Sequence, residues 1–195
     1  MEIAPRFSLT KFLAHSQQGV TAQIAWITLF ATATALGARV EIAHQPVPYT
    51  LQTLAVLLAG AFLGPRNGAI SQLVYLAAGV LGAPVFAAGG FGIAKLIGPT
   101  GGYLLAFPLA AALIGYLVRR RLTLLWSFAS MAIGLLVIFT CGTVQLYVVY
   151  FHDWAEAFGA GFLIFSWWDG IKLCAAAMTY HEVAKRWPAI PNENA

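Results

Sequence analysis

The sequence predicts an all-α integral membrane protein, a bundle of six transmembrane helices with both termini in the cytoplasm. Charged residues make up only 9% of the 195 residues, whereas a soluble domain carries roughly 25%. The charged positions leave five long uncharged runs, each longer than the ~20 residues that a helix needs to cross the hydrocarbon. A sixth apolar segment near the C-terminus holds a few charges. Such a chain has no room for a soluble catalytic or nucleotide-binding domain.

The basic residues set the orientation of the bundle. With the N-terminus inside and six alternating helices, most of the Lys and Arg residues fall on the cytoplasmic side, as the positive-inside rule requires. The net charge of +4 is therefore a topology signal and does not indicate nucleic acid binding. We expect a single membrane domain over 1–195, with cytoplasmic segments at 1–19 and 186–195 around a bundle at 20–185. No cleavable signal peptide is expected.

The first three helices are expected at about 20–38, 50–64 and 67–82. The first carries Ala31 and Ala35 one turn apart, and small residues let helices approach closely in a membrane. Internal packing and docking of another membrane protein are both open for this face. The second and third helices are joined by GPRNG, a tight cytoplasmic turn.

The last three helices are expected at about 101–118, 122–150 and 157–185. In the last of them Asp169 and Lys172 stand three residues apart and so share a helix face. Asp169 would lie about twelve residues into this helix, or ~18 Å at 1.5 Å per residue. Ionisable residues at that depth are costly and face the bundle interior, which makes them functional candidates. A structural ion pair that neutralises itself is the alternative.

An unusual loop connects the third and fourth helices on the outside face. Residues 82–103, GAPVFAAGGFGIAKLIGPTGGY, hold seven glycines and two prolines among large apolar side chains. Irregular backbone near membrane depth is tolerated only where protein buries it or where it lines a cavity. We therefore expect this loop to fold over or into the bundle. Polar groups near the same face are Gln52, Tyr75 and Tyr103.

No catalytic or metal-binding motif stands out. His181 and Glu182 begin like a zinc-protease motif, but Lys185 occupies the position of the second histidine. The sequence has neither the Gly-x-Ser-x-Gly motif of serine hydrolases nor a P-loop. We expect a protein that is not an enzyme and that needs no metal and no cofactor.

The segment of about Gln45–Leu117 resembles the biotin transporter (BioY) family, the biotin-specific S-components of energy-coupling factor (ECF) transporters. The resemblance rests, in chain order, on PVPYTLQTL, GPRNGAISQLVYLAAG and GAPVFAAGGFGIAKLIGPTGGY. Farther on, DGIK at 169–172 is similar to the Asp-x-x-Lys of the family. This resemblance implies a six-helix bundle with a pocket open to the outside, roofed by the loops after the first and third helices. It also implies high-affinity biotin binding for uptake across a prokaryotic cell membrane.

The resemblance further implies partners and site residues. Energy would come from a coupling membrane subunit and two ATP-binding subunits, met through small residues of the first helix, here Ala31 and Ala35. Some members of the family work as oligomers without that complex. The expected contacts of biotin are Asp169, Lys172, Gln52, Tyr75, Phe86, Gly89, Gly90 and Tyr103.

The chemistry of biotin suits these residues. Its ureido group offers two N–H donors and one carbonyl acceptor, which match a carboxylate and an ammonium. Whether Lys172 would bind this carbonyl or the carboxylate of biotin stays open. The alternative functions are an S-component or small carrier for another vitamin and, from a different class, an intramembrane enzyme.

Overall fold

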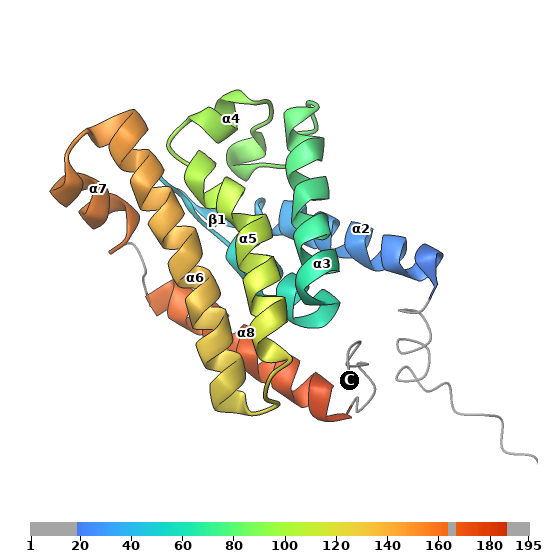
Figure 1. Ribbon diagram of the computed structural model, residues 1–195. Coiled ribbons are helices and arrows are strands. Elements are labelled where there is room, and N and C mark those ends of the chain that lie inside the picture. The colour runs from blue at the N-terminus through green and yellow to red at the C-terminus, as the bar shows by residue number, and fades with distance from the viewer. Residues whose placement is uncertain (1–18, 164–166, 187–195) are drawn as a thin grey trace, which may run out of the picture.

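The computed structural model describes residues 19–163 and 167–186, and these residues form almost only helices (Figure 1). The expected cytoplasmic segments therefore lie outside the described residues, except for Gly19 and Arg186. Four helical stretches are long and apolar enough to cross a membrane. They are α2 (Val20–Gly37), α3 (Gln52–Val80), α5 (Gly101–Val118) and α6 (Leu124–Leu146) with its π-helical extension η2 (Tyr147–Phe151).

Helix α3 consists of two segments that meet at Gly64. This residue has a φ of 78°, a conformation that glycine adopts without the steric cost that other residues meet. Pro65 follows it and starts the second segment, since the first turn of a helix tolerates a residue without an N–H. A Cβ built on Gly68 would lie 3.0 Å from the Cα of Gly60, so the second segment folds back against the first. The predicted helices at 50–64 and 67–82 correspond to the two segments of α3, which begins and ends two residues inside the predicted bounds.

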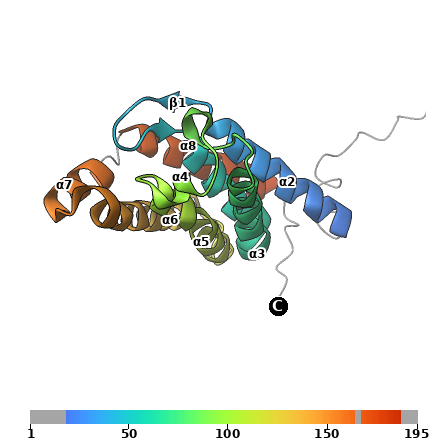
Figure 2. The ribbon, with the colours of Figure 1, turned by 90° about the horizontal axis from the view of Figure 1, so that it is seen from above.

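The helices form two layers, with α3, α5 and α6 in one and α2 and α8 (Trp167–Arg186) in the other (Figure 2). Helix α5 packs between α3 and α6, and α2 packs against α3. Helix α8 crosses α3 and α6 on the face away from α5 (Figures 1 and 2). Glycines bring α3 and α5 into backbone contact, because a Cβ on Gly60 would lie 2.5 Å from the carbonyl oxygen of Ala111. Small residues permit this kind of close helix packing in membranes.

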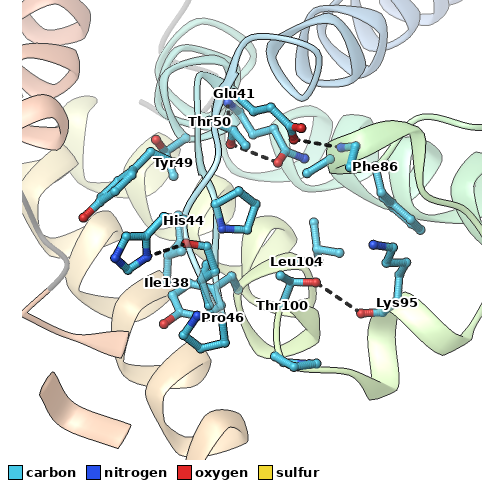
Figure 3. A pocket seen from close by; sticks show the side chains of 18 of the residues that line it. Glu41, His44, Pro46, Tyr49, Thr50, Phe86, Lys95, Thr100, Leu104 and Ile138 are labelled. Carbon is cyan, nitrogen blue, oxygen red and sulfur yellow. Dashed lines mark hydrogen bonds between the residues drawn. The ribbon is translucent and has the colours of Figure 1, made fainter. Parts of the chain in front are cut away.

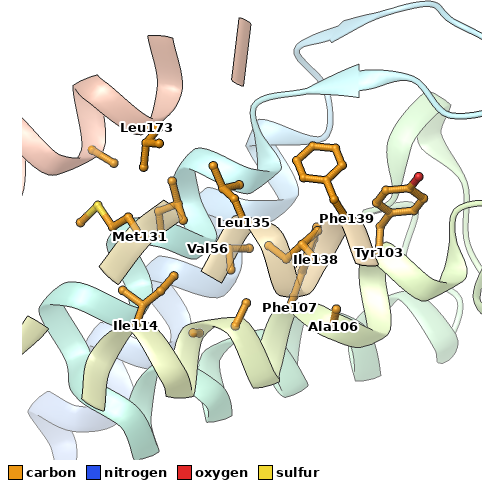
Figure 4. Close-up of a cluster of buried hydrophobic side chains, with 14 of the residues drawn as sticks. Val56, Tyr103, Ala106, Phe107, Ile114, Met131, Leu135, Ile138, Phe139 and Leu173 are labelled. Atoms are coloured by element: carbon orange, nitrogen blue, oxygen red, sulfur yellow. The ribbon is translucent and has the colours of Figure 1, made fainter. Parts of the chain in front are cut away.

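A single apolar core joins these helices (Figure 4). Ile114 of α5 and Leu135 of α6 are fully buried at its centre. Val56 of α3 and Leu173 of α8 extend the same core to the other helices. Because four helices share one core, the ends of these helices hold fixed positions relative to one another.

The predicted helix at 157–185 is wrong at its start. A separate short helix, α7 (Trp154–Gly161), precedes α8. The side chain of Asp153 accepts a hydrogen bond from the backbone N–H of Glu156 at 2.9 Å and caps α7. Asp169 is therefore in the first turn of α8, not twelve residues deep in a helix. A carboxylate in the first turn is favoured by the positive end of the helix dipole.

Two connections lie together over one end of the bundle. Residues 38–51 form a small antiparallel hairpin of β1 (Glu41–Ile42) and β2 (Tyr49–Thr50), with Glu41 opposite Thr50. The glycine-rich loop between α3 and α5 is irregular apart from the 3₁₀ turn η1 (Ala87–Gly89) and the one-turn helix α4 (Ala94–Ile97). Seen from above, the hairpin passes beside α4 (Figure 2).

Candidate functional site

A cavity of about 370 Å³ lies between these two connections and the helix ends below them (Figure 3). Pockets that bind small molecules usually measure about 300–1,000 Å³. The hairpin and the glycine-rich loop supply one end of the cavity, and α3, α5, α6 and α8 supply the other. Its apolar wall includes Phe86, Phe107 and Ile138.

Asp169 and Lys172 lie at the helical end of this cavity and form a buried ion pair. Their exposed fractions are 3% and 4%. The Lys172 Nζ contacts Asp169 Oδ1, and it donates to the Thr50 carbonyl oxygen at 2.9 Å and to Thr53 Oγ1 at 2.7 Å. An ammonium has three N–H donors, so all three are engaged. Within the described part of the chain, Asp169 Oδ2 has no hydrogen-bond partner.

Gln52 extends this polar network along the start of α3. Its Oε1 accepts a hydrogen bond from Thr50 Oγ1 at 3.0 Å, and its Nε2 donates to the hydroxyl of Tyr75. The Tyr75 hydroxyl in turn donates to the carbonyl oxygen of Val85 at 3.3 Å. This network therefore connects the helical end of the cavity to Val85, the residue before Phe86 in the glycine-rich loop.

Phe86 forms part of the cavity wall, and its ring packs against α3. A Cβ on Gly79 would lie 2.1 Å from Phe86 Cζ, which means that the ring lies directly on the backbone of α3. The ring of Tyr75 meets the ring of Phe86 edge to face, with centroids 5.5 Å apart. Such pairs add about 0.5–1.5 kcal/mol beyond their buried area. Phe86 is only 1% exposed, so its position is well defined.

Tyr103 contributes its ring to the cavity, while its hydroxyl has a structural role. The hydroxyl donates to the carbonyl oxygen of Gly161 at 2.9 Å, at the end of α7. Tyr103 thereby attaches α7 to α5. It presents mainly an apolar surface to a ligand.

Side-chain contacts hold the two outer connections in place. Glu41 Oε2 accepts the N–H of Ala88 at 2.8 Å, and Arg39 donates to the carbonyl oxygen of Pro84. Gln145 of α6 donates from Nε2 to the carbonyl oxygens of Leu96 and Gly98 at 2.8 and 2.7 Å. The glycine-rich loop is thus joined both to the hairpin and to α6.

Most residues expected to bind a ligand do meet at one cavity. Asp169, Lys172, Gln52, Phe86 and Tyr103 all line it. Three others are not part of its lining and stand beside or behind it: Tyr75, Gly89 and Gly90.

Sequence reasoning missed several residues of the lining. Glu41 and His44 come from the hairpin, and Lys95 comes from α4. Thr50 also lines the cavity, and its carbonyl oxygen accepts from Lys172. One sequence feature could have identified Lys95 as a lining residue: it is the sole charged residue of the apolar, glycine-rich loop at 82–103.

The two alanines expected to dock a partner lie on the inner side of α2. Ala31 is 7% exposed and belongs to the core, and Ala35 packs against that core. The exposed side of α2 carries Ile24, Leu29 and Leu36. Docking through Ala31 and Ala35 stays a prediction, and in this arrangement a subunit that contacts α2 would meet the exposed side chains first.

Comparison with known proteins now adds to this geometry. The sequence profile of the BioY family matches residues 8–189. The chain belongs to the BioY family. It is 39% identical over 150 residues to the biotin transporter BioY of Thermotoga maritima, a match that covers 77% of this chain and 88% of that relative. It is 40% identical over 156 residues to the probable biotin transporter BioY of Pyrococcus horikoshii, covering 80% and 92% of the two chains.

A solved structure shares the BioY fold seen here. The S-component for biotin from an ECF-type ABC transporter superimposes with a TM-score of 0.78, over 85% of this chain and 92% of that chain. The two sequences are 23% identical. The helical arrangement is therefore that of an S-component.

Proposed function

We propose that this chain is a high-affinity biotin-binding membrane subunit that mediates biotin uptake. The observation that carries the proposal is the buried Asp169, one of whose carboxylate oxygens has no hydrogen-bond partner among the described residues, at the helical end of an apolar cavity. Membership of the BioY family, whose relatives are named biotin transporters, supports it. Biotin is the cargo, and the function needs no catalysis, no metal and no cofactor.

The polar head of biotin fits the helical end of the cavity. Asp169 Oδ2 would accept a hydrogen bond from a ureido N–H, and hydrogen bonds to a charged acceptor are the stronger kind. Phe86, Phe107 and Ile138 would surround the fused rings with apolar surface. Lys172 has no N–H to spare, so its role is to hold Asp169 in place against α3.

We further propose six membrane spans with both termini in the cytoplasm. The two segments of α3 count as two spans, and α2, α5, α6 and α8 supply the other four. Arg119 at the end of α5 lies beside the Gly64 turn, so the turn that carries Arg66 and the connection that carries three arginines are neighbours at one end of the bundle. That end would be cytoplasmic, and the cavity at the opposite end would open to the outside of a prokaryotic cell.

Energy for uptake would come from partner subunits. The structural neighbour is an S-component of an ECF-type ABC transporter, which favours a complex of this chain with a coupling membrane subunit and two ATP-binding subunits. Ala31 and Ala35 of α2 would contact the coupling subunit after a shift of α2. A homo-oligomer without that complex is the other assembly to test.

Equilibrium binding of labelled biotin to the purified protein in detergent tests the proposal. We expect saturable binding that unlabelled biotin displaces and that riboflavin and thiamine do not. Displacement by riboflavin or thiamine but not by biotin would assign the chain to another vitamin. Chemical conversion of bound biotin would indicate an enzyme instead.

Uptake in cells tests the energy source. Labelled biotin uptake is measured in a host that lacks biotin transport and expresses this chain with or without an ATPase pair and coupling subunit. Uptake that needs the added subunits supports the complex, and equal uptake without them supports the oligomer.

A further inference from the structure

The loop end of the cavity holds a second cation, Lys95, whose ammonium has no partner in the part of the chain that the structure describes. Lys95 belongs to α4 and lines the cavity, and its amino end points toward Leu104 (Figure 3). The stem of this side chain lies against Gly90, where a Cβ would stand 2.3 Å from Lys95 Cε. Across the described residues, no hydrogen bond or ion pair involves the Lys95 ammonium.

Three other polar side chains that line this cavity already have partners. Lys172 uses its three donors on Asp169, Thr50 and Thr53. The ring nitrogen Nδ1 of His44 lies 3.3 Å from the carbonyl oxygen of Val47. Glu41 Oε2 accepts the N–H of Ala88. Of the two lysines that line the cavity, Lys95 is therefore the one with free donors among the described residues.

An ammonium in a half-buried apolar setting gains from a partner of opposite charge. Removing such a group from water is costly unless it is paired, and Lys95 is half-buried. Asp169 is paired with Lys172 at the opposite, helical end, and no salt bridge joins Glu41 to Lys95 within the described chain. The partner that fits is an anion supplied by the ligand.

Building on the proposed function, we propose that Lys95 binds the carboxylate of biotin. The ligand would lie with its ureido group at Asp169, its rings along the apolar wall and its acyl chain directed to α4. Each end of the elongated ligand then meets a group of complementary charge or hydrogen-bonding character. Gly90 also gains a function, because any side chain there would displace the stem of Lys95.

This assignment makes the transporter selective for a free acid. A hydrogen bond to a charged group contributes about 1.5–3 kcal/mol, which corresponds to roughly 10- to 100-fold in affinity. Biotin should therefore bind about 10- to 100-fold more tightly than biotin methyl ester. The ester keeps the ureido group and the rings but carries no negative charge.

The test compares biotin and biotin methyl ester in three proteins: the unmodified chain, Lys95→Met and Lys95→Arg. Lys95→Met should remove the preference for the acid, with ester affinity close to that of the unmodified chain, and Lys95→Arg should keep the preference. Retention of the preference by Lys95→Met would overturn the proposal, as would an equal loss of affinity for both ligands.

A control variant separates this proposal from the proposed function. Asp169→Asn should weaken binding of acid and ester by similar factors, since both carry the ureido group. If the unmodified chain binds neither ligand, the proposed function fails. If the chain binds both but without preference, only the role of Lys95 fails.

Discussion

The two ends of the cavity are built in different ways. At the helical end, Asp169 and Lys172 are less than 5% exposed, and Lys172 contacts three partners. At the loop end, the Lys95 ammonium has no partner among the described residues, and Glu41 is exposed with one hydrogen bond to Ala88. The helical end is thus held in place before a ligand arrives, with Asp169 Oδ2 left to accept from it, whereas the loop end has fewer fixed contacts.

This difference suggests a division of labour in binding. A site held in its bound conformation loses little entropy on binding, so the helical end supplies affinity. Segments with few buried contacts open at low free energy, so the loop end controls entry and release. Changes at the helical end should therefore alter affinity and stability. Changes to the contacts that join the two outer connections should mainly alter rates, while Lys95 should add affinity for the free acid.

The largest expected effect belongs to Asp169→Asn. The substitution leaves the Lys172 ammonium buried without a counter-ion, and breaking a buried pair costs about 3–5 kcal/mol of stability. Biotin affinity should fall at least 100-fold, because a strong acceptor is lost together with the fixed geometry. Thermal unfolding in detergent and labelled-biotin binding measure the two effects.

Two matched controls separate the structural role of Asp169 from its binding role. Asp169→Asn combined with Lys172→Met should regain much of the stability but not the affinity, and recovery of both would contradict a binding role. Glu182→Gln breaks an ion pair of the same spacing on α8, with side chains 57% and 54% exposed. Exposed pairs contribute little, so this variant should stay within about 1 kcal/mol of the unmodified protein.

An intermediate effect is expected for Gly79→Ala, where the loop end rests on α3. The added methyl group would overlap the ring of Phe86, and overpacking of this kind typically costs about 1–3 kcal/mol. Phe86 would be displaced into the cavity, and biotin affinity should fall with it. Gly159→Ala is the control, since nothing lies within 4 Å of a Cβ there. Unchanged binding by Gly79→Ala would mean that Phe86 is not part of the ligand wall.

Much of the fold was predictable from local sequence features. The long uncharged runs predicted the helices, and Gly64 with Pro65 marked the break inside α3. The composition of residues 82–103 predicted an irregular segment packed on the bundle, and that segment does line the cavity with Phe86 and Lys95. These features depend on the composition and order of residues close together in the chain, which can be read from a single sequence.

What the sequence did not reveal depends on contacts between distant residues. Lys172 binds the Thr50 carbonyl oxygen across 122 positions of the chain, and no local pattern indicates this pairing. The hydroxyl of Tyr103 is used by Gly161, 58 residues away. The division between α7 and α8 was missed because the residues around it are apolar, and the cap of α7 depends on Asp153 alone.

The smallest effect is expected for a substitution of Glu41, which lies at the loop end of the cavity. Glu41→Ala removes the acceptor for the Ala88 N–H, which joins the hairpin to the glycine-rich loop. An exposed contact of this kind is worth at most about 1 kcal/mol, so biotin should dissociate roughly 2- to 5-fold faster. The unfolding temperature should stay nearly unchanged, since Glu41 is exposed. Stopped-flow or filter-binding chase experiments measure the dissociation rate.

Glu41→Gln is the informative partner of that variant, because a glutamine amide retains an oxygen that can accept the Ala88 N–H. If the hydrogen bond between the two connections controls release, Glu41→Gln should dissociate at the rate of the unmodified protein while Glu41→Ala does not. If both variants release biotin equally fast, the negative charge is what matters, and the effect should then shrink at high salt. A loss of affinity in Glu41→Ala as large as that in Asp169→Asn would contradict the view that the contact between the two connections mainly sets rates.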